Sequence, residues 1–274
     1  MNKEHIELSK YNEEGTIIRK AQLRLLEMMI VLDKIFKKHK IPYVLSGGTC
    51  LGAVRHGGFI PWDDDVDIDM MRKEYKKILP ILEKDLPDKY EIQTIESDKN
   101  FYFIGAMRIV DKHSYVLSAS GDNDSRFRGL FIDILPDESV ISYRLKRSVG
   151  KLYRSGFHIR KGMLKDSSSG LKRLLAGLGW YPLLFFLFIL RKITFFTSKE
   201  KISNSYGALY SPRLKYSEIF PPKPMLFEGY EFLGPAKPHD YLKGLYGENY
   251  MQIPPKEKWQ IHSDKIEVYE MEDK

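Results

Sequence analysis

The residues with the clearest capacity for chemistry are aspartates gathered in one short stretch. Five of them fall within seven positions: Asp63, Asp64, Asp65, Asp67 and Asp69. Carboxylates this close repel one another and lose hydration, so the arrangement is costly unless a cation compensates it. A hard divalent cation such as Mg²⁺ or Mn²⁺ fits carboxylates combined with substrate phosphates. We therefore predict a metal site on Asp65 and Asp67, with Asp63 and Asp64 ordering the loop around it.

A pair of glycines upstream of the aspartates supplies the second part of this prediction. Gly47 and Gly48 follow a β-prone run at Tyr43–Ser46 and lead into the residues TCLGAVRH, a turn into a short helix. Glycine lets the backbone approach a ligand closely, and backbone N–H groups at a helix start attract an anion. Phosphate beside a metal indicates phosphoryl-type transfer, which needs charge neutralisation and alignment, and no Ser-His or Cys-His nucleophile is evident.

Other side chains could serve the same site, and each has a structural alternative. Arg55 and His56 lie between the glycines and the aspartates, where a cation would meet phosphate, although a lone Arg or His is more often structural. Arg108 would meet donor phosphates or would be a surface cation of its strand. Trp62 and Tyr246 would wall the site or stack on a base, or would fill the core.

A strand must align the aspartates, and the alternation of residues from Asp65 to Met71 predicts one. Val66, Ile68 and Met70 would face one way and the carboxylates the other. Alone, this alternation could equally describe the solvated face of an edge strand. The density of aspartates directly after aromatic and apolar residues favours the metal site.

The elements around this strand predict the fold class. Amphipathic periodicity predicts helices over Thr16–Lys40 and Arg72–Lys84. Further β-prone runs lie at Tyr90–Ile95, Phe103–Val110, Ser114–Leu117 and Leu130–Leu135. This order indicates an α/β or α+β architecture, in which a mixed sheet carries helices mainly on one face.

The second half of the chain reads as mainly helical beyond about Val140. Residues 165–170, with three serines, mark a break, so we predict a catalytic core at 1–165 and a helical addition at 166–274. A small hairpin is expected to turn near Glu228-Gly229. The region from His239 onwards is expected to pack back on the catalytic part, and His262 within it is interpreted as structural.

The most apolar stretch runs from Leu174 to Leu190 (174–190), carries no charge and is bracketed by Lys172-Arg173 and Arg191-Lys192. As a helix it would be about 26 Å long, slightly less than a hydrocarbon core of about 30 Å, and Pro182 interrupts it. Cations at both ends suit a segment that lies in an anionic membrane interface. A buried core helix and a true span are the alternatives, and we favour membrane contact.

The net charge limits the classes of binding partner to expect, and the cysteine content indicates the redox state of the cellular compartment. A net charge of +7 attracts nucleic acid, anionic lipid or phosphorylated small molecules. No zinc-finger spacing or RNA-binding signature is present, so we expect no nucleic acid partner. Cys50 is the single cysteine, which excludes an internal disulfide and fits a reducing compartment. The first fifteen residues are polar throughout, so we expect no cleaved signal and a cytoplasmic active face.

The stretch LSGGTCLGAVRHGGFIPWDDDVDIDM closely resembles the signature of the LicD family, which includes bacterial phosphocholine transferases and is related to fukutin-type proteins. GLFIDILP and DYLKGLYGENYMQIPP resemble later motifs of that family. The resemblance implies a nucleotidyltransferase fold in which Asp65, Asp67 and Asp133 hold metal, and Gly47, Gly48 and Thr49 form the donor-phosphate turn. By itself, Asp133 could be an ordinary strand aspartate.

The resemblance also implies a reaction. The donor would be CDP-linked, such as CDP-choline, and the acceptor a hydroxyl of a cell-surface or lipid-linked glycan, such as lipopolysaccharide or teichoic acid. Asp133 would orient or deprotonate that hydroxyl, Mg²⁺ or Mn²⁺ would be the cofactor, and the enzyme would be peripheral at the inner face of the cell membrane. The alternatives are a nucleotidyltransferase with a nucleoside triphosphate donor and a non-catalytic membrane or glycan-assembly protein.

Overall fold

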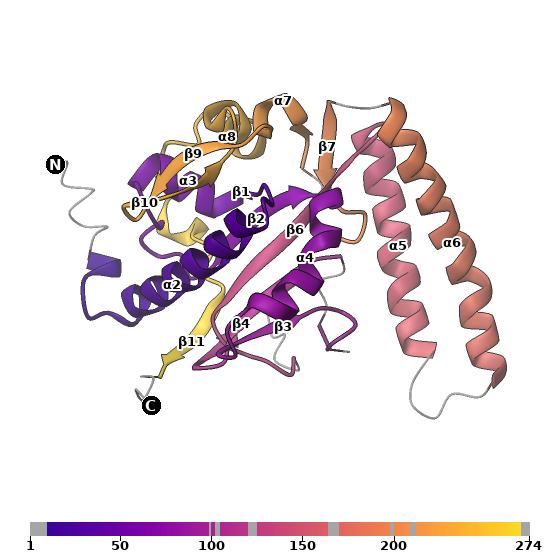
Figure 1. Cartoon of the computed structure of the whole chain (residues 1–274), viewed down its shortest axis with the longest axis horizontal. Coiled ribbons are helices and arrows are strands. Elements are labelled where there is room, and N and C mark those ends of the chain that lie inside the picture. Colours follow the sequence, from indigo (N-terminus) through magenta and orange to yellow (C-terminus); the bar gives the residue numbers. More distant parts are fainter. Residues whose placement is uncertain are drawn as a thin grey trace.

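The computed structural model describes residues 10–98, 100–101, 105–119, 125–163, 170–197, 200–208 and 212–269. Figure 1 shows a curled mixed sheet that is flanked by helices, with a hairpin of two long helices at one edge. This architecture confirms the predicted α+β fold class.

The main sheet has the strand order β1-β2-β6-β4-β3, and β7 and β8 continue it from the far half of β6. Its strands are β1 (Val44–Leu45), β2 (Val66–Met71), β3 (Tyr90–Gln93), β4 (Met107–Asp111), β6 (Phe131–Ser139), β7 (Lys201–Asn204) and β8 (Leu214–Lys215). Strands β2 and β6 run parallel, and their register pairs Asp67 with Asp133. Strand β4 runs antiparallel to β6 and sets Arg108 opposite Asp133. Two strands therefore bring their polar residues to the same point of β6.

Helices α2 (Ile17–Lys38) and α4 (Arg72–Asp85) cover one face of this sheet (Figure 1). Val66, Ile68 and Met70 are fully buried in the core that includes α2. Because side chains alternate along a strand, Asp67 must point to the opposite face. The predicted division of this strand into an apolar and an acidic face is therefore confirmed.

Element boundaries follow local backbone chemistry. Thr16 caps α2, because its hydroxyl accepts a hydrogen bond from the N–H of Arg19 at 3.2 Å. The strand expected at Phe103–Val110 begins only at Met107, because Gly105 adopts a φ of +82°, which interrupts extended chain. Residues 103–104 of that expectation lie outside the described part.

The chain beyond β6 first leaves the sheet and then returns to it. Helices α5 (Tyr143–Met163) and α6 (Gly170–Thr197) pack against each other and project beyond the sheet edge (Figure 1). The expected break at 165–170 lies, apart from Gly170, outside the described residues. Strand β7 then pairs with β6, so the division at residue 165 stays a prediction.

The apolar stretch 174–190 lies within α6, which continues through Pro182 without a break. The described residues contain one helical window long and apolar enough to cross a membrane, Gly177–Thr194, of which 22% is buried. Most of this window is therefore exposed, unlike a core helix.

The remaining C-terminal elements surround the free face of the main sheet. They are α7 (Tyr216–Ile219), β9 (Lys223–Phe227), β10 (Tyr230–Gly234), α8 (Pro238–Tyr246), a short 3-10 helix at Lys256–Lys258 and β11 (Ser263–Val268). Another short 3-10 helix, Lys10–Asn12, precedes α2 near the N-terminus. Strands β9 and β10 form the expected hairpin, whose turn residues Glu228 and Gly229 have φ of +51° and +79°. Helix α8 packs on α3 (Gly47–His56).

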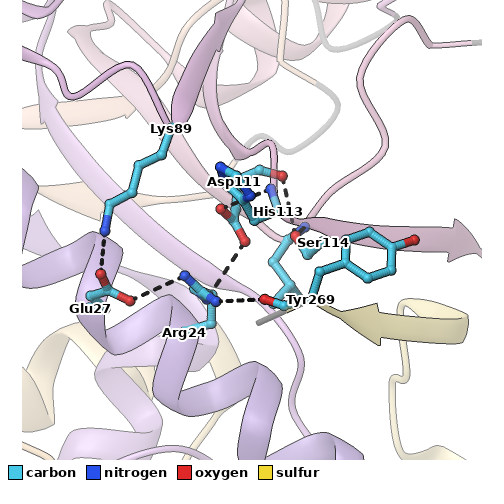
Figure 2. Close-up of polar contacts among 8 residues, drawn as sticks. Arg24, Glu27, Lys89, Asp111, His113, Ser114 and Tyr269 are labelled. Carbon is cyan, nitrogen blue, oxygen red and sulfur yellow. Dashed lines mark hydrogen bonds and ion pairs between the residues drawn. The ribbon is translucent and has the colours of Figure 1, made fainter. Parts of the chain in front are cut away.

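A polar cluster fixes β11 against α2 (Figure 2). Arg24 of α2 donates a hydrogen bond to the carbonyl of Tyr269 at 3.1 Å and lies 3.8 Å from the buried carboxylate of Asp111. Glu27 pairs with Arg24 and with Lys89, which precedes β3. Strand β11 pairs antiparallel with β5 (Ser114–Ser118), so the cluster holds one end of β11 while its other end reaches toward Asp64 and Asp65.

Close packing of α3 against the following loop yields a stability prediction. A Cβ added at Gly52 would lie 2.4 Å from the carbonyl oxygen of Gly58, a backbone atom that cannot move alone. We expect Gly52→Ala to lower the free energy of unfolding by about 1–3 kcal/mol, as overpacking does. Denaturant unfolding checks this, and Gly162→Ala, on a helix with open space around it, serves as the matched control. Equal stability of Gly52→Ala and the wild type would contradict the prediction.

Candidate active site

A cavity of about 940 Å³ opens on the sheet face opposite α2 and α4. The carboxylates of β2 and β6 form its floor, and the loop before β2, the start of α3 and the C-terminal region form its walls. The predicted site residues that line it are Gly47, Gly48, Arg55, Trp62, Asp63, Asp65, Asp67, Arg108, Asp133 and Tyr246. A cavity of this volume can hold a nucleotide-sized ligand.

Four aspartates from the acidic stretch line this cavity, with Asp69 the deepest in β2. Asp63 is buried, and Asp65 and Asp67 are half-buried. Burial raises the pKa of Asp67 well above its usual value, and the charges of Asp65 and Asp133 raise it further. Burial likewise raises the pKa of Asp63 and Asp65, although His262 opposes the shift at Asp65. The site therefore concentrates negative charge that a cation would stabilise.

The glycine pair makes room for these carboxylates. A Cβ added at Gly47 would lie 3.4 Å from Asp67 Oδ2, and one added at Gly48 would lie 3.0 Å from Asp63 Oδ2. Gly47 also has a φ of +51°, which favours glycine. Its N–H donates to the hydroxyl of Tyr241 at 3.0 Å. The start of α3 thus meets both the carboxylates and the open cavity, where its positive end suits an anionic ligand.

Asp133 lies beside Asp67 in the parallel register and accepts two hydrogen bonds from Arg108. Arg108 Nε and Nη2 approach its carboxylate oxygens at 2.7 and 2.9 Å, and the guanidinium stacks 3.6 Å from the ring centre of Phe131. Arg108 therefore borders the cavity and neutralises the carboxylate of Asp133, so it is not an isolated surface cation of its strand.

Three predicted site residues do not line the cavity. Thr49 is buried, and its hydroxyl accepts a hydrogen bond from the N–H of Asp67 at 2.9 Å, which fixes α3 to β2. His56 accepts a hydrogen bond from Arg55 Nε at 2.9 Å at the end of α3. Asp64 is buried, and its Oδ1 accepts from the N–H of His262 at 3.2 Å. These contacts position the site.

The wall residues have partners in the C-terminal region. Trp62 stacks on Trp259 with ring centres 3.8 Å apart and an interplanar angle of 1°. Arg55 donates to the carbonyls of Tyr250 and Gln252 at 3.3 and 3.2 Å. The region that follows His239 therefore completes the site.

Sequence reasoning gave His262 a structural role and did not single out Tyr241. His262 Nε2 lies 3.6 Å from Asp65 Oδ2, and Asp63, Asp65 and His262 place one ligand atom each within 4.8 Å of one another. Tyr241 holds Gly47 and Ser46 through its hydroxyl. Neither residue lies in a recognisable spacing with the aspartates, because about two hundred residues separate them. The donor set of carboxylates plus one imidazole fits a divalent cation.

These features define an enzyme that handles phosphate-linked groups beside clustered carboxylates. Comparison with known proteins agrees: residues 40–170 match the family described as LicD/FKTN/FKRP, nucleotidyltransferase domain. The chain is thus a LicD-like phosphotransferase.

Relatives of known name share different parts of the chain. The lipopolysaccharide cholinephosphotransferase LicD of Haemophilus influenzae is 28% identical over 260 residues, which cover 89% of this chain and 95% of that protein. The ribitol-5-phosphate transferase FKTN of Mus musculus is 33% identical over 101 residues, 36% of this chain and 22% of that protein. The human FKTN is 33% identical over 94 residues, 34% of this chain and 20% of that protein.

Substitution of one carboxylate tests the metal site. In Asp67→Asn, repulsion with Asp65 is relieved, so we expect the metal-free protein to be as stable as the wild type or more stable. The pKa of Asp67 is raised in the folded state, so the wild-type protein loses stability as pH rises above the pKa of about 4 that an Asp has in the unfolded chain. Asp67→Asn cannot ionise at this position, so its stability should decline less over the same pH range.

The readout is the thermal midpoint with and without Mn²⁺ or Mg²⁺. We expect the wild-type midpoint to rise with metal and the rise to vanish in Asp67→Asn, since a ligand that binds the folded state stabilises it. The exposed Asp88→Asn serves as control. An undiminished metal-induced rise in Asp67→Asn would contradict the metal site.

The ion pair of Arg108 with Asp133 gives a separate test of Asp133 as a ligand. Arg108→Met removes the cation that occupies both oxygens, so Mn²⁺ affinity should increase severalfold if Asp133 binds the ion. The double variant Arg108→Met with Asp133→Asn should lose this gain. Calorimetric titration with Mn²⁺ measures both, and equal affinities in the two variants would exclude Asp133 from the ligand set.

Proposed function

We propose that this LicD-like phosphotransferase moves a substituted phosphate group from a CDP-linked donor to a hydroxyl of a cell-surface or lipid-linked glycan. The observation that carries the proposal is that Asp63 and Asp67 lie against the start of α3, with Asp65 close to Asp63 in the same nucleotide-sized cavity. The names of the relatives, a cholinephosphotransferase and a ribitol-5-phosphate transferase, support the transferred group and the glycan acceptor.

Mg²⁺ or Mn²⁺ is the proposed cofactor, with Asp65 and Asp67 as its main ligands and Asp133 and His262 at the border of the site. Bound there, the cation would neutralise donor phosphate charge and polarise the phosphorus under attack. Among the described residues, Asp67 and Asp63 are the carboxylates that face the glycine turn, and Asp65 lies with Asp63 and His262 in one cluster that could hold the ion.

The chain's own residues account for the remaining demands of the reaction. The start of α3 would bind donor phosphate through backbone N–H groups such as that of Gly48, since the Gly47 N–H already donates to the hydroxyl of Tyr241. Arg108 would stabilise phosphate charge while it holds Asp133 in place. Trp62, stacked on Trp259, gives an aromatic wall against which a base can rest.

In the proposed reaction the acceptor oxygen attacks the phosphorus that bears the transferred group. A new oxygen–phosphorus bond forms as the bond to the CMP oxygen breaks, so CMP leaves with that electron pair. The hydroxyl proton passes to a carboxylate of the site, for which Asp133 is the candidate because it lies beside Asp67. With CDP-choline as donor, the product is a phosphocholine ester of the glycan.

The family description also names a nucleotidyltransferase domain, which keeps transfer of a nucleoside monophosphate as the second candidate. The two reactions release different products, CMP in the first and pyrophosphate in the second. Both candidates use the same cavity, so the structure of the donor decides between them.

A donor screen tests the proposal directly. Purified protein with Mn²⁺ or Mg²⁺ is offered CDP-choline, CDP-ribitol, CDP-glycerol, UDP-glucose and CTP, and released CMP and pyrophosphate are quantified. We expect CMP from one CDP-linked donor, and a loss of at least a hundredfold in Asp65→Ala, since electrostatic contacts to a reacting phosphate contribute about that factor or more. Pyrophosphate from CTP without CMP release would favour the second candidate.

The acceptor and location remain part of the proposal. We propose that the enzyme works in the cytoplasm, peripherally at the inner face of the cell membrane, where a lipid-linked glycan acceptor would be presented. The exposed apolar window of α6 supports this location.

A further inference from the structure

The α5–α6 hairpin is the most basic part of the chain. Residues 143–163 and 170–197 contain eleven Lys and Arg residues and no Asp or Glu. The whole chain has a net charge of +7, so the hairpin carries more positive charge than the whole protein and the remainder is acidic. Charge segregation of this kind creates a directional field toward an anionic surface.

Helix α6 adds an exposed apolar stripe to this charge. Leu178, Tyr181 and Phe185 are 63%, 64% and 66% exposed, and Phe188 continues the same spacing of three or four residues. Such spacing places them on one helix face. A contiguous apolar patch of this kind on the surface of a protein marks an interaction site.

Helix α5 combines both properties on its exposed surface. Leu145, Leu152 and Ile159 are exposed and lie seven residues apart, so they form one line along the helix. Arg147 and Lys151 are also exposed, about 100–160° around the helix axis from that line. This is the pattern of a helix that lies in a membrane interface with its cations among lipid phosphates.

We propose that the α5–α6 hairpin docks lengthwise on an anionic membrane surface. Its exposed apolar residues enter the headgroup region, and its exposed Lys and Arg residues, such as Arg147 and Lys151, contact lipid phosphates. Membrane binding by the hairpin requires no catalysis. This inference therefore rests on the proposed function only where it assumes that the membrane presents the glycan acceptor.

Packing within the hairpin argues against a span by α6. Trp180, Leu187 and Leu190 are buried, and Trp180 stacks on Tyr153 of α5 with ring centres 5.2 Å apart. A span would require α6 to leave α5 or α5 to cross the bilayer with seven cations, which is costly. A second copy of the chain is also disfavoured as occupant, because two such basic faces repel each other.

The base of the hairpin is fixed to the strand that carries Asp133. Glu138, at the end of β6, is buried and accepts hydrogen bonds from Arg191 of α6 at 2.5 and 3.1 Å. Arg72 of α4 reaches the same carboxylate at 3.4 Å. Arg154 of α5 donates to the carbonyl of Ala208 at 2.6 Å. Docking of the hairpin would therefore set the orientation of the active-site sheet relative to the membrane.

Flotation of the full chain with lipid vesicles tests the docking. We expect the protein to bind phosphatidylcholine vesicles that contain phosphatidylglycerol, to release them at high salt, and to bind pure phosphatidylcholine vesicles much less. The double variant Tyr181→Asp with Phe185→Asp should lose binding and keep its thermal midpoint, since both side chains are exposed. Leu226→Asp, equally exposed on β9, is the matched control and should bind like the wild type.

The cations are tested in the same assay. Arg147→Gln with Lys151→Gln should weaken binding to the anionic vesicles roughly 30-fold, the factor that corresponds to about 1 kcal/mol for each of two charges. Lys76→Gln with Lys84→Gln, exposed on α4, removes the same charge elsewhere and should have a much smaller effect. Equal losses in the two charge variants would show a general charge effect and would overturn a docking role for the hairpin.

Equal binding to neutral and anionic vesicles would overturn the proposal, as would undiminished binding of the Tyr181→Asp and Phe185→Asp double variant. A dimer in solution that dissociates in this double variant would also overturn it. Protein that resists extraction from cell membranes by alkaline carbonate would indicate a span. CMP release from the soluble donor is measured on the same samples. Failure of the wild-type protein to bind anionic vesicles, with intact CMP release, counts against docking alone, whereas vesicle binding without CMP release counts against the proposed reaction.

Discussion

The in-register parallel pairing of β2 and β6 is the constraint on which the site depends. It sets Asp67 beside Asp133, while the period of two places Asp65 on the same side of the strand. The same alternation commits Val66 and Ile68 to the core, so the carboxylates cannot turn away without exposing apolar side chains. Their crowding is thus enforced by hydrophobic burial on the other face, and the protein must neutralise the resulting charge.

Several features of the structure reduce the negative charge of these carboxylates. Raised pKa values at Asp63, Asp65 and Asp67 favour proton uptake, and Arg108 compensates Asp133. Burial also raises the pKa of Asp69, deeper in the same strand, to about 7, although hydrogen bonds from Ser46 and Asn204 oppose the shift. A divalent cation would replace protons at the outer carboxylates and leave the deeper ones as part of the sheet.

The C-terminal region closes the site. Tyr241 holds the start of α3, Trp259 stacks on Trp62, and His262 approaches Asp65. The polar cluster around Arg24 and Asp111 keeps β11 in the position from which His262 reaches the cavity (Figure 2). Residues beyond the helical hairpin are therefore integral to the cavity, and a separation of the chain near residue 165 would remove one of its walls.

The sequence by itself determined the acidic strand, the glycine pair, the amphipathic helix α2 and the fold class, because each depends on local periodicity or on conformational demands of single residues. It also indicated the apolar segment within α6, since composition alone reveals it. Tertiary structure decided that Arg108 pairs with Asp133, that Thr49, His56 and Asp64 lie off the cavity wall, and that His262 and Tyr241 join the site. These outcomes depend on strand register and on contacts between distant segments, which no local pattern encodes.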